Sequence, residues 1–166
     1  MNARPVLSIP RSVGEVLLEV AAAAGLALMI GGLASFWGSI PDRVPLHFGI
    51  TGAPDRWGSK GELLILLAVS LALYTGLTFI SRIPHHFNYP WQITEANARE
   101  QYRLSRLLVT GLKAIVVWMF TSILWGTVEV ALGRRDGLDV FALPVSLLLI
   151  FGWMGLQLAR MYRARS

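Results

Sequence analysis

Charged residues are scarce in this chain of 166 residues, and they are unevenly spread. Only 15% of the residues are Asp, Glu, Lys or Arg, against about 25% in a typical soluble domain. No charged residue occurs in residues 20–41, 63–81 or 140–159, and residues 107–128 contain only Lys113. A helix needs about 20 mainly apolar residues to cross the core of a bilayer. The sequence therefore predicts an integral membrane protein with four membrane-spanning helices.

Cysteine is absent, which excludes disulfides, thiol chemistry and zinc sites with cysteine ligands. A net charge of +5 also occurs in proteins that bind nucleic acid. The Lys and Arg residues instead flank the apolar stretches, as is usual in membrane proteins. No basic surface interleaved with aromatic residues is left over. We therefore expect the lipid bilayer as the main partner, with no direct nucleic-acid binding and no cofactor.

The expected fold is an all-α bundle in one membrane domain, residues 1–166. The helices are expected at about residues 14–37, 63–82, 107–131 and 140–161. The first apolar stretch is too long for the core of a signal peptide, so we interpret it as an uncleaved anchor.

Two loops separate the first three helices, an ordered outer loop at residues 38–62 and a cytoplasmic loop at residues 83–106. Within the second loop, Ala98, Tyr102 and Ser105 recur at helical spacing after Thr94, a plausible N-cap residue. This pattern predicts that the third helix begins earlier, as an amphipathic extension.

The distribution of Lys and Arg predicts the orientation. The two tails and the second loop together carry nine of these residues, whereas the first and third loops carry five. Cytoplasmic segments of membrane proteins are enriched in Lys and Arg. We therefore expect a multi-pass protein of the cell (plasma) membrane, with both termini in the cytoplasm and the first loop outside.

Small residues form a ladder along the first helix. Ala23, Ala27, Gly31 and Ser35 follow one another at intervals of four. Such a ladder allows close approach of another helix in a membrane. We therefore expect this face to be a packing face, and assembly into a homo-oligomer stays open.

The loop at residues 38–62 is dense in structural signals. Its three prolines fix φ, and three of its glycines permit turns. Val44, Phe48, Ile50 and Trp57 favour burial, which is unusual in a disordered linker. We therefore expect a compact cap folded over the ends of the helices.

The same loop carries a recognisable pattern. It contains Pro41, Pro45, His47-Phe48, Gly52, Pro54-Asp55 and Trp57-Gly58-Ser59-Lys60. A second pattern follows, with Asn88-Tyr89-Pro90, Ile93-Thr94, Asn97, Gln101-Tyr102 and Lys113. Together they resemble the bacterial domain of unknown function 1648, found in SdpI-type toxin-immunity membrane proteins. For immunity members, this resemblance implies protection from a secreted toxin and signalling through a repressor held at the membrane.

The resemblance marks several residues as motif or ligand-binding candidates: His47, Phe48, Gly52, Pro54, Asp55, Lys60, Asn88, Pro90, Asn97 and Tyr102. The chemistry of His47 suits a metal ligand or a proton acceptor. A lone histidine that braces the loop through a backbone carbonyl fits equally, because the spacing of a zinc site is missing. Asp55 is expected to accept backbone N–H groups in a turn. Lys60, at a helix start that disfavours cations, is expected to pair with Asp55, with Asp42 or with a lipid phosphate.

Two opposite charges lie inside apolar stretches at the same expected depth. Glu19 belongs to the first helix and Lys113 to the third. A charge in the hydrocarbon costs several kcal/mol unless it pairs or reaches the interface. The two side chains are expected to form an intramembrane polar pair, and the alternative is that Lys113 extends to the membrane surface.

Two functions follow from these patterns, and a purely structural or assembly role stays open beside them. The first is a binding, immunity or signalling protein that recognises a ligand, such as a secreted peptide or toxin, at the outer loop and engages a regulator inside. The second is a small intramembrane enzyme or transporter with a polar or metal site formed by His47, Asp55 and Glu129. No nucleophile–base constellation and no His-Glu-x-x-His pattern is present, so no catalytic residue is assigned and the first function is favoured.

Overall fold

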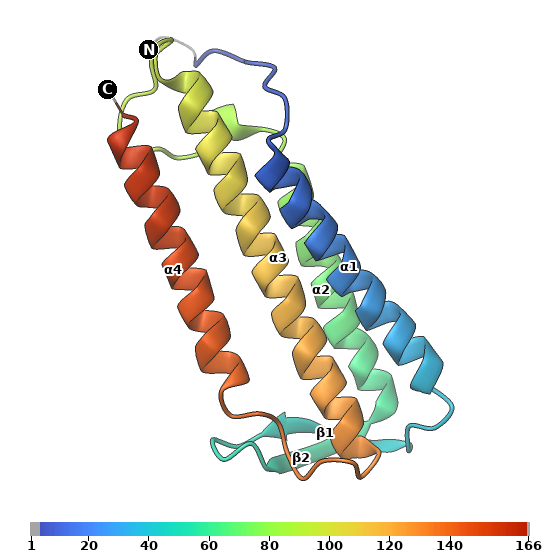
Figure 1. Ribbon diagram of the computed structural model, residues 1–166. Helices are drawn as coiled ribbons and strands as arrows, with labels where there is room; N and C mark the ends of the chain where they lie inside the picture. Colours follow the sequence, from blue (N-terminus) through green and yellow to red (C-terminus); the bar gives the residue numbers. More distant parts are fainter. Residues whose placement is uncertain (1–3, 166) are drawn as a thin grey trace.

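The structure is a computed structural model that describes residues 4–165, and it is dominated by four long helices (Figure 1). These are α1 (Val13–Phe36), α2 (Leu63–Ile80), α3 (Ala98–Ala131) and α4 (Ala142–Arg163). Each is long and apolar enough to cross a membrane. The predicted fold class, an all-α multi-pass membrane protein with four helices, is confirmed.

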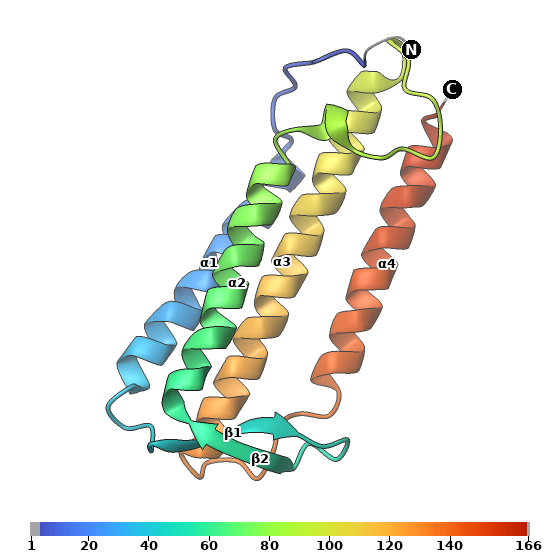
Figure 2. The same cartoon turned by 180° about the vertical axis from the view of Figure 1, so that it is seen from behind.

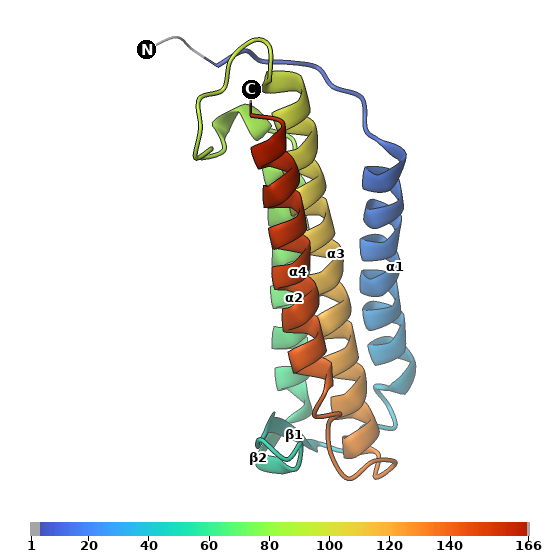
Figure 3. The ribbon, with the colours of Figure 1, turned by 60° about the vertical axis from the view of Figure 1, so that its left-hand side comes forward.

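The helices are arranged around α3 rather than as a symmetric bundle. α3 packs closely against α1, α2 and α4, whereas α4 packs on α3 and makes at most marginal contact with α1 and α2. Both chain ends lie at the same end of the helices, and the loop between α1 and α2 lies at the other (Figures 1 and 3). α3 is therefore the element through which α4 is held to the rest of the molecule.

Local sequence determines where the first helix begins. Ser12 and Glu15 form a reciprocal capping box, in which the Glu15 amide donates to Ser12 Oγ (3.2 Å) and the Ser12 amide to Glu15 Oε2 (2.7 Å). This pairing satisfies two of the amides that a helix start leaves without partners.

The third helix begins at Ala98, so the predicted start at residue 107 was too late and the predicted extension is present. The loop between α2 and α3 is correspondingly shorter than residues 83–106. Asn97 directly precedes the helix but makes no side-chain cap bond to it. Thr94 takes part in the cap, because its Oγ1 accepts from the Asn97 amide (3.4 Å) and its carbonyl oxygen accepts from the Ala98 amide (2.9 Å).

The loop after α1 folds into a β-hairpin, which the sequence analysis did not predict. Strands β1 (Arg43–Phe48) and β2 (Pro54–Ser59) are antiparallel and lie across the helix ends (Figure 2). Gly52, in the turn between them, has φ = 80°, which glycine adopts without steric cost. A short 3₁₀ turn, η1 (Lys60–Glu62), then leads into α2.

The turn of the hairpin is clamped by the loop between α3 and α4. The Leu138 amide donates a hydrogen bond to the Gly52 carbonyl oxygen (2.9 Å). A Cβ on Gly52 would lie 2.3 Å from the Leu138 oxygen, and one on Gly137 would lie 2.4 Å from the Gly52 oxygen. Such distances are sterically forbidden, so both glycines are required for this contact.

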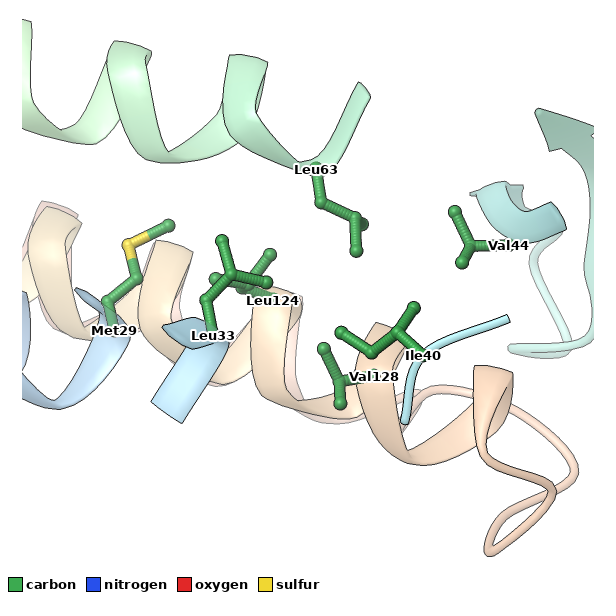
Figure 4. Close-up of a cluster of buried hydrophobic side chains, with 7 residues drawn as sticks. All are labelled: Met29, Leu33, Ile40, Val44, Leu63, Leu124 and Val128. Carbon is green, nitrogen blue, oxygen red and sulfur yellow. The ribbon is translucent and has the colours of Figure 1, made fainter. Parts of the chain in front are cut away.

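An apolar cluster joins the hairpin to three helices. Seven buried side chains converge there, as Figure 4 shows: Met29, Leu33, Ile40, Val44, Leu63, Leu124 and Val128. Val44 of β1 is completely buried. The hairpin is therefore part of the folded body, as a compact cap requires.

The small residues predicted as a packing face of α1 make no close helix contact within the described residues 4–165. Ala23, Ala27, Gly31 and Ser35 are all exposed, and a Cβ on Gly31 would meet no atom within 4 Å. α1 packs on α3 through a different face, on which Gly25 approaches Val117 and Trp118. Ala23 and Ala27 are therefore open at the surface, and Gly31 and Ser35 border an open cavity between α1 and α3.

Candidate functional sites at the two ends of the helices

His47 and Asp55 face each other on the exposed side of the hairpin. His47 Nδ1 lies 2.6 Å from Asp55 Oδ1, and the two side chains are 63% and 51% exposed. The sequence left His47 open between a metal ligand or proton acceptor and a brace on a backbone carbonyl, and it predicted that Asp55 accepts backbone amides. The structure instead joins the two side chains across the strands, which leaves Nε2 of the imidazole outside this contact.

A metal site at the hairpin receives no support from the geometry. Among residues 4–165, no group of three or more His, Asp or Glu side chains is placed to hold a metal ion. Glu129, expected near His47 and Asp55, pairs with Arg134 instead, at 3.1 Å. The predicted three-residue site is therefore not assembled.

Lys60 pairs with Asp42, one of the two aspartates considered for it. Its Nζ lies 3.1 Å from Asp42 Oδ1 and 3.5 Å from the Ile40 carbonyl oxygen. The same ammonium lies 5.7 Å from the centre of the Trp37 ring, within the range of a cation–π contact. Because Asp42 is 96% exposed, this pair contributes little to stability.

Three other motif residues of this loop shape the hairpin. Phe48 and Pro54 are cross-strand partners at the end of the ladder, and Gly52 makes the turn. The first motif therefore specifies a folded cap that presents His47 and Asp55.

The predicted pair of Glu19 and Lys113 is present near the opposite end of the helices. Lys113 Nζ donates to both oxygens of Glu19 (2.8 and 2.6 Å) and to Thr78 Oγ1 (2.7 Å). The Tyr74 hydroxyl also donates to Glu19, at 3.2 Å. Lys113 is completely buried, so its side chain does not reach the membrane surface. The network ties α1, α2 and α3 together.

A second ion pair, which the sequence analysis missed, lies one helical turn away on α1. Arg106 Nη2 donates to Glu15 Oε2 (3.1 Å), and its other contacts include the Ile9 and Pro10 carbonyl oxygens. Glu15 is 4% exposed. The sequence did contain a signal for this pair. Glu15 and Glu19 are four residues apart and Arg106 and Lys113 are seven apart, so each pair lies on one face of its helix. Because Arg106 was expected in the second loop and not on the third helix, its ion pair with Glu15 was not predicted.

A small polar cavity of about 50 Å³ lies beside both ion pairs. Arg11, Glu15, Glu19 and Arg82 are among the residues that line it. This space can hold water. Glu19, whose side chain is 21% exposed, is therefore the buried pair's point of contact with solvent.

The second motif fastens α4 to the start of α3. Asn97 Nδ2 donates to the Arg165 carbonyl oxygen (2.7 Å), and Gln101 Nε2 donates to those of Met161 and Ala164 (2.8 Å each). These carbonyls belong to the end of α4, where a helix leaves acceptors without partners. Asn97 and Gln101 therefore cap α4 from a neighbouring element.

Aromatic side chains order the loop that carries this motif. The Tyr89 hydroxyl donates to the Pro84 carbonyl oxygen (2.9 Å) and lies 2.8 Å from Ser105 Oγ. Burial raises the pKa of Tyr89 to about 12. Tyr102 is 1% exposed beneath it, whereas Asn88 and Pro90 are exposed in the loop. Tyr102 and Asn97 thus have structural roles.

The hairpin and its two flanking helices coincide with a known sequence family. Residues 24–71 match the model of DUF1648, a domain of unknown function. This match confirms the resemblance to the domain of unknown function 1648 for the segment that carries the first motif. The DUF1648 segment includes the second half of α1, the whole hairpin and the first half of α2, and it ends before the second motif.

One curated protein is similar to part of the chain. An uncharacterised protein of Archaeoglobus fulgidus is 41% identical over 85 residues, which cover 46% of this chain and 46% of the relative. The chain thus matches under half the length of that protein. No solved structure matches the chain.

Proposed function

We propose that this chain is a multi-pass membrane protein that binds an extended peptide at its hairpin, on the outer side of the membrane. The observation that carries this proposal is the free outer edge of β2. Among residues 4–165, β2 has one sheet neighbour, β1, and no other segment pairs with it. An unpaired strand edge offers backbone donors and acceptors to another extended chain.

Side chains along β2 suit such a ligand. Asp55, Arg56 and Trp57 are all exposed, and Trp57 is 43% exposed despite its size. In strand addition, the backbone hydrogen bonds provide affinity, and alternate side chains provide specificity. Tryptophan and arginine are common anchors in binding interfaces. β2 therefore combines a general binding edge with residues that can select a sequence.

The anchoring of the hairpin supports the same function. An isolated two-stranded hairpin is only marginally stable in water. Here the cluster around Val44 and the clamp on Gly52 hold it in place. A ligand that adds a strand to a fixed edge does not have to order that edge, which lowers the entropic cost of binding.

Peptide binding can be tested on the purified chain in lipid nanodiscs with a library of random ten-residue peptides. Selected peptides are expected to slow amide hydrogen exchange at residues 56–58 and to bind at least about tenfold more weakly to Trp57→Ala, the effect of a strong interface residue. Phe141→Ala is a matched control, because Phe141 is exposed at the same end of the molecule. Failure to select any peptide, or exchange protection confined to other segments, contradicts the proposal.

The proposed orientation has a separate test. Ile50 is 99% exposed at the hairpin tip, and Arg99 is exposed near the opposite end. In this cysteine-free chain, Ile50→Cys is expected to react with a membrane-impermeant maleimide on intact cells. Arg99→Cys is expected to react only after lysis. The reverse pattern would place the hairpin inside the cell.

An immunity or signalling role is the wider proposal. The resemblance of the first motif to SdpI-type proteins supports a secreted peptide as the ligand, with a regulator at the end that carries both termini. Cells that produce the chain are expected to survive a secreted toxic peptide that binds the hairpin, and Trp57→Ala is expected to abolish this protection. Equal survival with the variant contradicts the role.

A further inference from the structure

A second cavity lies between α3 and α4, at the end of the molecule that carries both termini. Its volume is about 380 Å³. Its lining includes Arg103, Arg160 and Arg163, together with Glu100 and two leucines, Leu104 and Leu107. This cavity is separate from the hairpin and from the cavity beside Glu19.

The charges around this cavity do not balance. Arg103 donates from Nε to Glu100 Oε2 (2.8 Å) and from Nη2 to Glu100 Oε1 (2.5 Å). This two-point contact occupies the one carboxylate among the lining residues. Arg160 and Arg163, on the last turn of α4, are exposed and form no ion pair with any residue from 4 to 165. Two guanidinium groups therefore face the cavity without an anion.

The wall of the cavity toward the membrane is apolar. Leu104 and Leu107 lie on α3, one helical turn apart, next to Arg103 and buried in the fold. On α4, Leu156 and Leu158 are exposed just before the arginines. The cavity thus has cations at the end of the helices and leucines toward their middle. This order matches a phospholipid, whose phosphate lies at the interface and whose acyl chains run inward.

We propose that this cavity binds the headgroup phosphate of an anionic phospholipid. Arg160 and Arg163 would hold the phosphate, and an acyl chain would lie against Leu104 and Leu107. Basic pockets between membrane helices are suited to such headgroups, and guanidinium groups bind phosphate through paired hydrogen bonds. An anionic lipid is favoured over a zwitterionic one, because a choline or ethanolamine group would add a cation beside the arginines.

The test measures lipid binding to the purified full chain by native mass spectrometry from detergent micelles. Micelles contain either phosphatidylglycerol or phosphatidylcholine with the same acyl chains. The wild-type chain is expected to retain phosphatidylglycerol preferentially. Arg160→Gln/Arg163→Gln is expected to weaken that binding about thirtyfold, since each arginine near a membrane surface contributes about fivefold.

The matched control is Arg99→Gln/Arg165→Gln, which removes the same charge from the same end but no residue that lines the cavity. It is expected to retain the preference for phosphatidylglycerol. Equal loss in both double variants would show a general surface-charge effect and overturn the proposal. Equal binding of the two lipids by the wild-type chain also overturns it. If inorganic phosphate alone displaces the bound lipid at micromolar concentration, the site is for a free anion and the lipid assignment is wrong.

Discussion

Replacing Lys113 by methionine isolates the contribution of its ammonium group, because the two side chains are similar in length. In the native fold the ammonium has three acceptors within 2.8 Å, two on Glu19 and one on Thr78. In Lys113→Met, the carboxylate of Glu19 keeps the Tyr74 hydroxyl as its donor. The carboxylate then loses its direct ion-pair partner, and Arg11 and Arg82 remain across the small cavity that it lines.

The expected magnitude follows from this geometry. Removing one partner of a buried ion pair costs about 3–5 kcal/mol. Glu19 retains 21% exposure of its side chain, so partial hydration places the loss near the lower limit, at about 3 kcal/mol. One kcal/mol shifts the unfolding midpoint of a chain of this size by about 2–4 °C. The midpoint of Lys113→Met is therefore expected to fall by roughly 6–12 °C.

Thermal unfolding of the purified chain in a mild detergent, followed by the fluorescence of its six tryptophans, measures this shift. Lys60→Met is the matched control, because it removes the same group from a pair in which Asp42 is 96% exposed. The control is expected to lose less than about 1 kcal/mol. If Lys60→Met loses as much free energy of unfolding as Lys113→Met, the effect arises from the change in net charge and not from the buried pair.

The double variant Glu19→Gln/Lys113→Met decides whether the two charges act as a pair. Replacing a buried ion pair by neutral groups is often close to neutral for stability. We therefore expect the double variant to be more stable than Lys113→Met alone. A loss equal to or greater than that of the single variant refutes the pairing. Exchange of the two charges, Glu19→Lys/Lys113→Glu, should likewise restore part of the stability.

Three further predictions concern other contacts. Gly111→Ala should weaken the packing of α4 on α3, since the added Cβ would lie 2.2 Å from the Trp153 ring; Gly76→Ala, with no atom within 4 Å, should leave thermal unfolding nearly unchanged. Gln101→Ala should cost about 1–3 kcal/mol through unpaired carbonyls, and hydrogen exchange at the end of α4 should accelerate. Burial raises the pKa of Tyr89 to about 12 in the folded chain, so the unfolded chain loses the hydroxyl proton at a lower pH. The free energy of unfolding should therefore fall between about pH 10 and pH 12. Tyr89→Phe should reduce that fall in an alkaline unfolding titration.

The membrane spans could be predicted because long uncharged runs have few alternative structures. The pair of Glu19 and Lys113 could be predicted for a related reason, since two opposite charges at one depth in an apolar region have few other partners. Glu129 was predicted incorrectly because it lies at a helix end, where Arg134, five residues along the chain, is a nearer partner. Where charged residues are frequent, several side chains compete for each ion-pair partner, and a neighbour along the chain is often the nearest.

The hairpin was not predicted because its strands are short and its prolines and glycines resemble those of an irregular loop. Val44, Leu46 and Phe48 recur at every second position, which was the available signal of a strand. The capping of α4 by Gln101 could not be predicted from the sequence for another reason. It depends on the packing of two helices whose contacting residues are 60 positions apart, and no local pattern encodes such a contact.

The clamp between the hairpin and the loop after α3 has a consequence for which changes the chain can tolerate. The hydrogen bond uses main-chain atoms of Gly52 and Leu138, so the identity of the side chain at residue 138 does not create it. Besides Gly52 and Gly137, the contact requires the correct length of chain on each side. Substitutions at residue 138 should therefore be far better tolerated than a single inserted or deleted residue between α3 and α4. The third loop acts as a fixed-length spacer that sets where the hairpin rests on the helices.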